Sequence, residues 1–135
     1  MAGDDATSGP DLIREVNEAV ERRDLEAISR MMRPDVVWRH NIGVGTVEEG
    51  EYEGRESVLA LFERIIEPWE YMRPTPHEIR DLGRGVFAIR GELQAKHGAA
   101  ETEIVTPYEQ RVELRDGLLA RGEMVSGPGA RLAEP

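Results

Sequence analysis

The stretch ELRDGLLARGEMV, residues 113–125, decides the fold. Segments of strand-like composition stand on both sides of Arg-Asp-Gly at 115–117, and such a sequence is typical of a tight turn between antiparallel strands. Alternating apolar residues also occur in the preceding segments, so this turn joins the last two members of a longer series. We expect strands near 77–82, 85–96, 101–114 and 118–125.

Apolar residues at the start of the chain recur at helical spacing instead. We expect a first helix from Pro10 to about Arg23, with Ser8 as its candidate cap. Another helix is predicted over 55–66, and Trp69 is expected to continue its apolar face. These helices have charged residues on their opposite faces, so each is predicted to cover a core on one side only.

A short second helix is predicted between these two. Asp24 is its candidate cap, and Met31 and Met32 are expected at its buried edge. Pro34 ends it, because proline disfavours a helical conformation in the residue before it. The chain then enters the strand VVWRH at 36–40, where two valines and a tryptophan favour a sheet.

The order of elements predicts an α+β domain: helix, helix, strand, helix and then four strands. The long last strands must curl around the helices, which makes a cone-shaped, mostly antiparallel sheet with an interior. We expect this domain over 10–126, a disordered N-terminus over 1–9 and a loose tail over 127–135. The glycine-rich segment 41–54 lacks the lysine of a phosphate-binding loop and contains several glutamates, so a flap beside the cone is expected instead.

Composition limits the possible partners. The chain has 135 residues, a formal net charge of −10 and no cysteine. A charge of this sign disfavours nucleic acid and anionic membranes, and the missing thiol excludes disulfides and thiolate zinc sites. The three histidines are scattered and do not indicate a metal site. No apolar run is long enough to span a bilayer and the acidic start is unlike a signal peptide, so a cytoplasmic location is expected.

Four segments together resemble one family. They are RRDLEAISRMMRPDVVW at 22–38, YEGRESVLALFERI at 52–65, IIEPWEYMRPTPHEIRDLGRGVFAI at 65–89 and the final ELRDGLLARGEMV. The chain resembles the nuclear transport factor 2-like superfamily, and within it the SnoaL-like domains, over roughly residues 10 to 126. The superfamily includes isomerases, dehydratases, epoxide hydrolases, polyketide cyclases and proteins without chemistry, so the resemblance implies a fold and a pocket but no single reaction.

The ketosteroid isomerases of this superfamily have a general-base aspartate on the first strand, at a position that corresponds to His40. Their oxyanion tyrosine corresponds to Val16, and their second acid corresponds to Gln110 or Glu109, depending on the anchor used. The tyrosine is missing and the base has changed. Steroid-type isomerisation is therefore disfavoured.

The limonene epoxide hydrolases offer a second comparison. Trp38 with His40 or Asn41 is similar to their first-strand aromatic and asparagine, and Arg90 with Glu92 is similar to their arginine and aspartate. Their last aspartate aligns with Met124, which we expect to line the pocket.

Strand alternation gives an independent expectation. Tyr108 and Gln110 share the side of Val112 and should point into the cone, as should Trp38 and His40 on the first strand. For the strand expected over 85–96, alternation and the epoxide-hydrolase comparison disagree. Its apolar residues lie on the side opposite to Arg90 and Glu92, so these two are either hydrolase residues or an outward surface pair.

The chemistry predicted from these residues is proton transfer next to a carbonyl group, without a cofactor. His40 is the candidate base, because an imidazole exchanges protons near neutral pH. Trp38 offers an apolar wall, while Asn41, Tyr108 and Gln110 are candidate hydrogen-bond donors to an oxygen. The alternatives are an epoxide hydrolase using Arg90 and Glu92, or a non-catalytic ligand-binding or dimerisation domain. A homodimer through a sheet face and a hydrophobic small-molecule ligand are expected.

Overall fold

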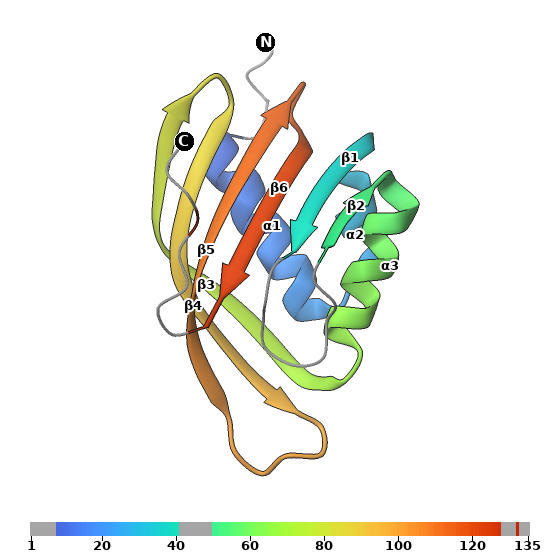
Figure 1. The fold of residues 1–135 in the computed structure, drawn as a ribbon, viewed down its shortest axis with the longest axis vertical. Coiled ribbons are helices and arrows are strands. Elements are labelled where there is room, and N and C mark those ends of the chain that lie inside the picture. The colour runs from blue at the N-terminus through green and yellow to red at the C-terminus, as the bar shows by residue number, and fades with distance from the viewer. Residues whose placement is uncertain (1–7, 41–49, 128–131, 133–135) are drawn as a thin grey trace.

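The computed structural model describes residues 8–40, 50–127 and 132. Figure 1 shows a strongly curved sheet whose concave side holds the helices, so the predicted α+β cone is confirmed. The elements are α1 (Gly9–Arg22), α2 (Leu25–Arg30), β1 (Met32–His40), β2 (Gly50–Glu53), α3 (Arg55–Ile66), β3 (Trp69–Gly83), β4 (Val86–His97), β5 (Ile104–Arg115) and β6 (Leu118–Ser126). The strand order is β2-β1-β6-β5-β4-β3, and the sheet does not close.

The two predicted helix caps are present. The side chain of Ser8 accepts a hydrogen bond from the amide of Asp11 at 3.1 Å, and Asp24 accepts one from Ala27 at 3.0 Å. Each cap satisfies a backbone N–H group that has no partner inside its helix. None of the described helices is long and apolar enough to cross a membrane.

Two residues assigned to helices belong to strands. Met32 begins β1, since α2 already ends at Arg30, and Trp69 begins β3 instead of extending α3. β3 therefore starts well before the predicted residue 77. The prediction was wrong because Pro74 and Pro76 look like strand breakers. Proline is tolerated here because β3 is an edge strand, where every second N–H group points away from the sheet and makes no ladder hydrogen bond.

Two smaller differences concern strand limits. β5 begins at Ile104, three residues after the predicted start at 101, and a short strand β2 precedes α3. β2 pairs antiparallel with β1, with Trp38 opposite Tyr52. The segment 41–49, which includes Asn41 and most of the predicted flap, lies outside the described residues, as do 1–7 and most of the tail.

The register of the sheet fixes which side chains share a row. β1 and β6 are parallel, with Trp38 opposite Gly122 and His40 opposite Met124. The β5–β6 hairpin places Met124 opposite Gln110, and β4 continues this row with Ile89. The row from His40 to Ile89 therefore lies on the same, concave face of four neighbouring strands.

A bulge bends the sheet at its far edge. β3 has one extra residue between Pro76 and Glu78, opposite Gly91 of β4. A Cβ atom on Gly91 would lie 2.2 Å from the carbonyl oxygen of Thr75, so only glycine permits this close approach. The irregularity lies on β3, and the alternation of β4 continues through Gly91 without a change of face.

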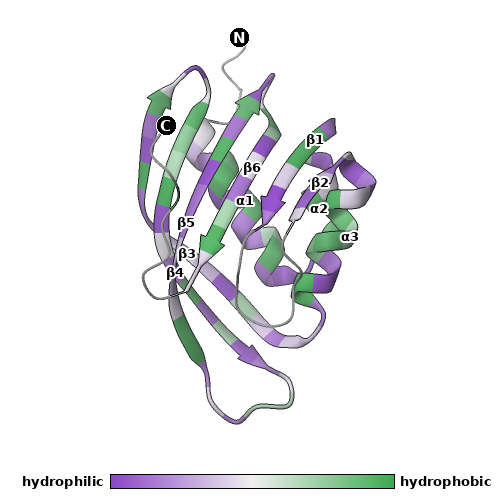
Figure 2. Cartoon of the chain, viewed as in Figure 1, coloured by the Kyte–Doolittle hydropathy of each residue, from purple (hydrophilic) through white to green (hydrophobic). Residues whose placement is uncertain are grey.

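The core lies between the concave face and the helices. Figure 2 shows apolar and polar residues alternating along the strands, as expected for a sheet with one covered face. α1 packs against β3, and α3 packs against β1 and β2. The largest fully buried side chains are Ile28, Met32, Leu61, Ile89, Val36 and Val58.

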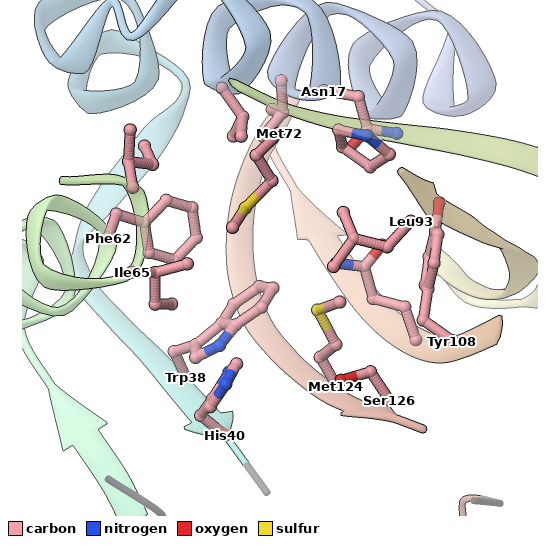
Figure 3. Close-up of a pocket in the computed structure, with 15 residues that line it drawn as sticks. Asn17, Trp38, His40, Phe62, Ile65, Met72, Leu93, Tyr108, Met124 and Ser126 are labelled. Atoms are coloured by element: carbon pink, nitrogen blue, oxygen red, sulfur yellow. The ribbon is translucent and has the colours of Figure 1, made fainter. Parts of the chain in front are cut away.

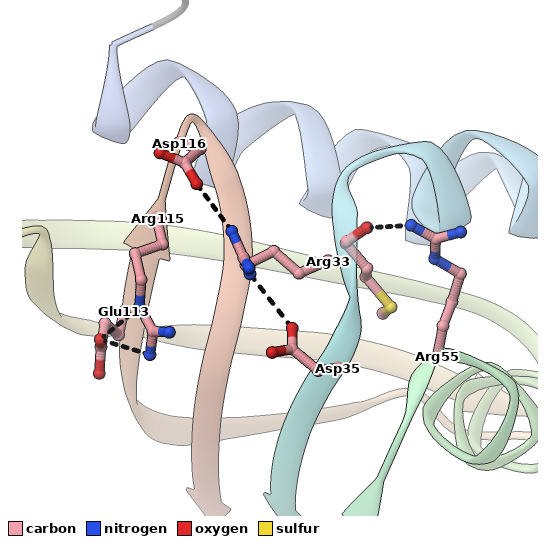
Figure 4. Close-up of polar contacts among 7 residues, drawn as sticks. Arg33, Asp35, Arg55, Glu113, Arg115 and Asp116 are labelled. Atoms are coloured by element: carbon pink, nitrogen blue, oxygen red, sulfur yellow. Dashed lines mark hydrogen bonds and ion pairs between the residues drawn. The ribbon is translucent and has the colours of Figure 1, made fainter.

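Arginines link neighbouring elements near the start of β1, as Figure 4 shows. Arg33 on β1 donates to Asp116 in the β5–β6 turn at 2.8 Å and to Asp35 at 3.1 Å. Its hydrogen bond holds the pKa of Asp35 below the ordinary value. Arg55 at the start of α3 donates to the backbone oxygen of Met32 at 2.7 Å. These contacts tie the start of β1 to the β5–β6 turn and to α3.

Gly122 has a specific packing role opposite Trp38. A Cβ atom at Gly122 would lie 2.2 Å from the Trp38 indole, which crosses β6 at this point. The indole also packs against Phe62, with ring centroids 5.2 Å apart in an edge-to-face arrangement. An added methyl group at Gly122 therefore requires the indole to shift.

We predict that Gly122→Ala lowers the free energy of unfolding by about 1–3 kcal/mol, because overpacking a buried site displaces its neighbours. Urea unfolding followed by tryptophan fluorescence measures this effect. Gly98→Ala is the matched control, since a Cβ atom there meets only the Pro68 oxygen at 3.7 Å. Equal stability of the two variants would contradict the packing role of Gly122.

Candidate functional site

A pocket lies between the concave sheet face and helices α1 and α3 (Figure 3). Its lining is mostly apolar and includes no Asp, Glu, Lys or Arg among the described residues. The lining residues are Val16, Asn17, Val20, Trp38, His40, Phe62, Ile65, Ile66, Met72, Pro74, Leu93, Tyr108, Gln110, Met124 and Ser126. Such a combination of apolar walls and a few polar groups is typical of a small-molecule site.

The pocket is small. The centres of water-sized molecules can occupy about 80 Å³ of it. One enclosed water needs about 10–15 Å³ on this measure, so the space admits several waters or a compact ligand in their place. The shape therefore favours a small, compact ligand over a long chain.

Strand alternation directs several of the residues predicted from the sequence toward this pocket. Trp38 and His40 come from β1, Met124 from β6, and Tyr108 and Gln110 from β5. The residues His40, Met124 and Gln110 lie opposite one another on three adjacent strands. Two strand spacings, about 10 Å across the sheet, therefore separate the backbones of His40 and Gln110. Five of the eight residues proposed from the sequence thus line one cavity. Their chemical roles stay predictions.

His40 is buried at the end of β1, with 5% of its surface exposed. Figure 3 shows its imidazole beside the indole of Trp38, which comes from the same face of the strand. Arg39, between them, is exposed on the other face and pairs with Glu123 at 3.8 Å. Because successive residues of a strand face opposite sides, the imidazole of His40 points into the pocket while the charged side chain of Arg39 points to the outer surface.

Tyr108 has a buried hydroxyl in the pocket. Only 3% of the residue is exposed, and the hydroxyl has no hydrogen-bond partner among the described residues. Burial raises the pKa of Tyr108 above its ordinary value, because the phenolate would lose its hydration. The group therefore stays protonated and acts as a hydrogen-bond donor at neutral pH.

Arg90 and Glu92 do not belong to the pocket. Arg90 is 59% exposed and pairs with Glu109 at 3.1 Å, whereas Glu92 is 55% exposed and lies 3.5 Å from His77. Both point from β4 to the outer face, since Phe87, Ile89 and Leu93 take the inner one. The prediction of an epoxide hydrolase that uses this pair is therefore wrong, and the alternative of an outward surface pair holds.

Asn17 is a pocket residue that the sequence analysis did not identify. It lies on α1, and its side-chain nitrogen is buried without a partner among the described residues. A signal was present, because Asn17 interrupts the apolar stripe that Ile13, Val16 and Val20 form. Asn41 lies outside the described residues.

No group of three His, Asp or Glu side chains within the described ranges is arranged to hold a metal ion. The polar atoms of the pocket are amide, indole, imidazole and hydroxyl groups, which suit hydrogen bonding to an uncharged organic ligand.

Comparison with known proteins identifies the family. The model of the SnoaL-like domain matches residues 13–122, so the chain belongs to the SnoaL-like domain family. No curated protein matches the sequence.

Solved structures share the fold. An NTF2-like protein of unknown function from Burkholderia pseudomallei is 22% identical, with a TM-score of 0.74 over 87% of this chain and 88% of its own. TerC, crystallised with polyporic acid, is 23% identical, with a TM-score of 0.74 over 87% and 89%. IdmH, a putative polyketide cyclase from Streptomyces antibioticus, is 20% identical, with a TM-score of 0.73 over 88% and 91%. At these identities the likeness shows the fold alone.

We predict that the Tyr108 hydroxyl makes folding sensitive to alkaline pH. Its pKa is raised in the folded state, so its contribution to stability is complete below about pH 10, where the unfolded tyrosine titrates, and is lost above it. Tyr108→Phe should therefore flatten the decline of unfolding free energy between about pH 9.5 and 11. Urea titrations at each pH measure the slope, and identical slopes in both proteins would contradict the prediction.

Proposed function

We propose that this SnoaL-like protein binds a compact, uncharged carbonyl compound in the cone pocket and catalyses proton transfer with His40 as general base. The observation that carries the proposal is the composition of the lining. His40 is its one side chain, among those described, that ordinarily titrates near neutral pH. It is buried beside Trp38 and in a row with Gln110.

The absence of Asp, Glu, Lys and Arg from the described lining supports an uncharged ligand. A carboxylate or phosphate would lose its hydration in this pocket without gaining a cationic partner, which is costly. The net charge of −10 also opposes the entry of anions. A neutral ketone or quinone meets neither penalty, and its ring can stack on the Trp38 wall.

The proposed reaction begins when the imidazole of His40 takes a proton from the carbon next to the carbonyl. The electron pair of the broken C–H bond moves to the carbonyl oxygen, and the resulting enolate oxygen accepts a hydrogen bond from Gln110. Where a C=C bond adjoins that carbon, return of the proton from His40 to the far carbon of the resulting dienolate moves the double bond and completes an isomerisation. Alternatively the enolate carbon attacks a second carbonyl, and His40 protonates the new alkoxide in a cyclisation.

The family supports this reading at a coarser level. IdmH is a putative polyketide cyclase, and TerC was crystallised with polyporic acid, so proteins of this fold include a candidate cyclase and one crystallised with a small organic molecule. These facts concern those proteins. For this chain they favour a small-molecule pocket and are compatible with cyclase chemistry.

A second candidate function is binding without turnover. The observation that favours it is that the described lining has a single ordinary acid–base group, whereas many proton-transfer enzymes pair two. In that case His40 would act as a hydrogen-bonding partner for a bound ligand and leave it unchanged.

We also propose a homodimer through the outer face of the sheet. This face alternates in charge, since Arg39 and Arg111 flank Glu123 at 3.8 and 3.7 Å, and Arg90 pairs with Glu109. Alternating charges complement themselves when a second copy is related by a two-fold axis.

We predict that His40→Gln reduces catalysed exchange of the C2 protons of 1-tetralone in D2O by about 10²- to 10⁴-fold, the usual contribution of a general base. Proton NMR follows the exchange. His77→Gln is the matched control, because His77 is exposed on the outer face. Full activity of the His40 variant would contradict the base assignment, whereas tight binding with no exchange by the native protein would favour the non-catalytic function.

We predict that sedimentation equilibrium gives the mass of two chains, and that Glu123→Arg shifts the equilibrium toward one chain by placing like charges together. A mass of one chain for the native protein would contradict the dimer.

A further inference from the structure

Three hydrogen-bond donors of the pocket are buried without an acceptor among the described residues. They are the side-chain amide nitrogen of Asn17, the indole N–H of Trp38 and the hydroxyl of Tyr108. They come from α1, β1 and β5, so no local feature of one segment explains all of them. Buried polar groups in proteins are nearly always paired, and each exception needs an explanation.

The shared pocket distinguishes these three from other unpaired atoms. The indole of Trp69 also lacks a partner, but Trp69 does not line the pocket. The residues that carry the three donors all line the same pocket, so a molecule bound there is the nearest source of an acceptor. A missing acceptor inside a cavity is most simply supplied by the molecule that fills it.

The donors lie at two ends of the pocket. Figure 3 shows Trp38 and His40 together at one end, while Asn17 and the hydroxyl of Tyr108 are directed toward the other. The space between them is bordered by apolar side chains. Met72, Leu93 and Met124 contribute to this middle section.

We infer that the pocket recognises a neutral ring compound with two acceptor oxygens on opposite sides, such as a para-quinone or a cyclic diketone. Trp38 donates to one oxygen beside His40, and Asn17 and Tyr108 donate to the other. This inference rests on the proposed function, because it assumes that the pocket binds a carbonyl compound. It adds the second polar end, which makes Asn17 and Tyr108 determinants of specificity.

The test compares 1,4-naphthoquinone, which has two opposed carbonyls, with 1-tetralone, which has one. The chain contains no cysteine, so the quinone meets no thiol to alkylate. We expect the native protein to bind the quinone about 5- to 10-fold more tightly in calorimetric titrations, the effect of one additional hydrogen bond. Asn17→Leu and Tyr108→Phe should each reduce this preference to about twofold or less, while tetralone affinity stays unchanged.

Two control variants test whether the effect belongs to the pocket. Tyr71→Phe makes the same substitution and Gln94→Leu an analogous one in side chains that bond Glu103 outside the pocket, and both should keep the preference. The thermal midpoint gives a second readout. Tyr108→Phe should not lower it, because the lost hydroxyl has no protein partner among the described residues.

Equal affinity of the native protein for both compounds, including no binding of either, overturns the inference. A preference that survives in both pocket variants also overturns it, as does an equal loss in the control variants. The proposed function is tested separately through His40→Gln, which should abolish proton exchange and leave the preference for the quinone intact. Failure of one proposal is therefore distinguishable from failure of the other.

Discussion

The parallel pairing of β1 with β6 is the constraint on which the site depends. It places Trp38 opposite Gly122 and His40 opposite Met124, and in this part of β1 Val36, Trp38 and His40 are buried while Arg39 faces outward. A slip of one residue would exchange these faces and bury an arginine in an apolar cavity. The contact of the indole with Gly122, which has no side chain, and its packing against Phe62 favour this register.

The two faces of the sheet have different tasks. The concave face is apolar apart from a few hydrogen-bonding groups, and some of these donors lack partners among the described residues. An unpaired buried donor reduces stability, so its retention at a cavity suggests a use that outweighs this cost. The convex face holds the formal charges in short ladders of Arg and Glu, among them the Arg90–Glu109 pair.

The sequence was sufficient for the architecture because its strongest signals are local. The Asp-Gly turn, the capping residues Ser8 and Asp24 and the alternation in β5 each act within a few residues. The sequence was insufficient where the conformation or the direction of a residue depends on elements that are distant in the chain. Pro74 is compatible with a strand only because β3 lies at an edge, and the outward position of Arg90 follows from the packing of the whole of β4. Asn17 becomes a pocket residue only when α1 meets a sheet formed much later in the chain.

The central claim is that one concave pocket, and not the charged outer face, receives the ligand. Proton–nitrogen NMR of the protein titrated with 1,4-naphthoquinone tests it most directly. The account predicts that the indole N–H signal of Trp38 and the side-chain amide signals of Asn17 shift together, while the guanidinium signal of Arg90 stays in place. Shifts at Arg90 with no change at Trp38 would contradict it.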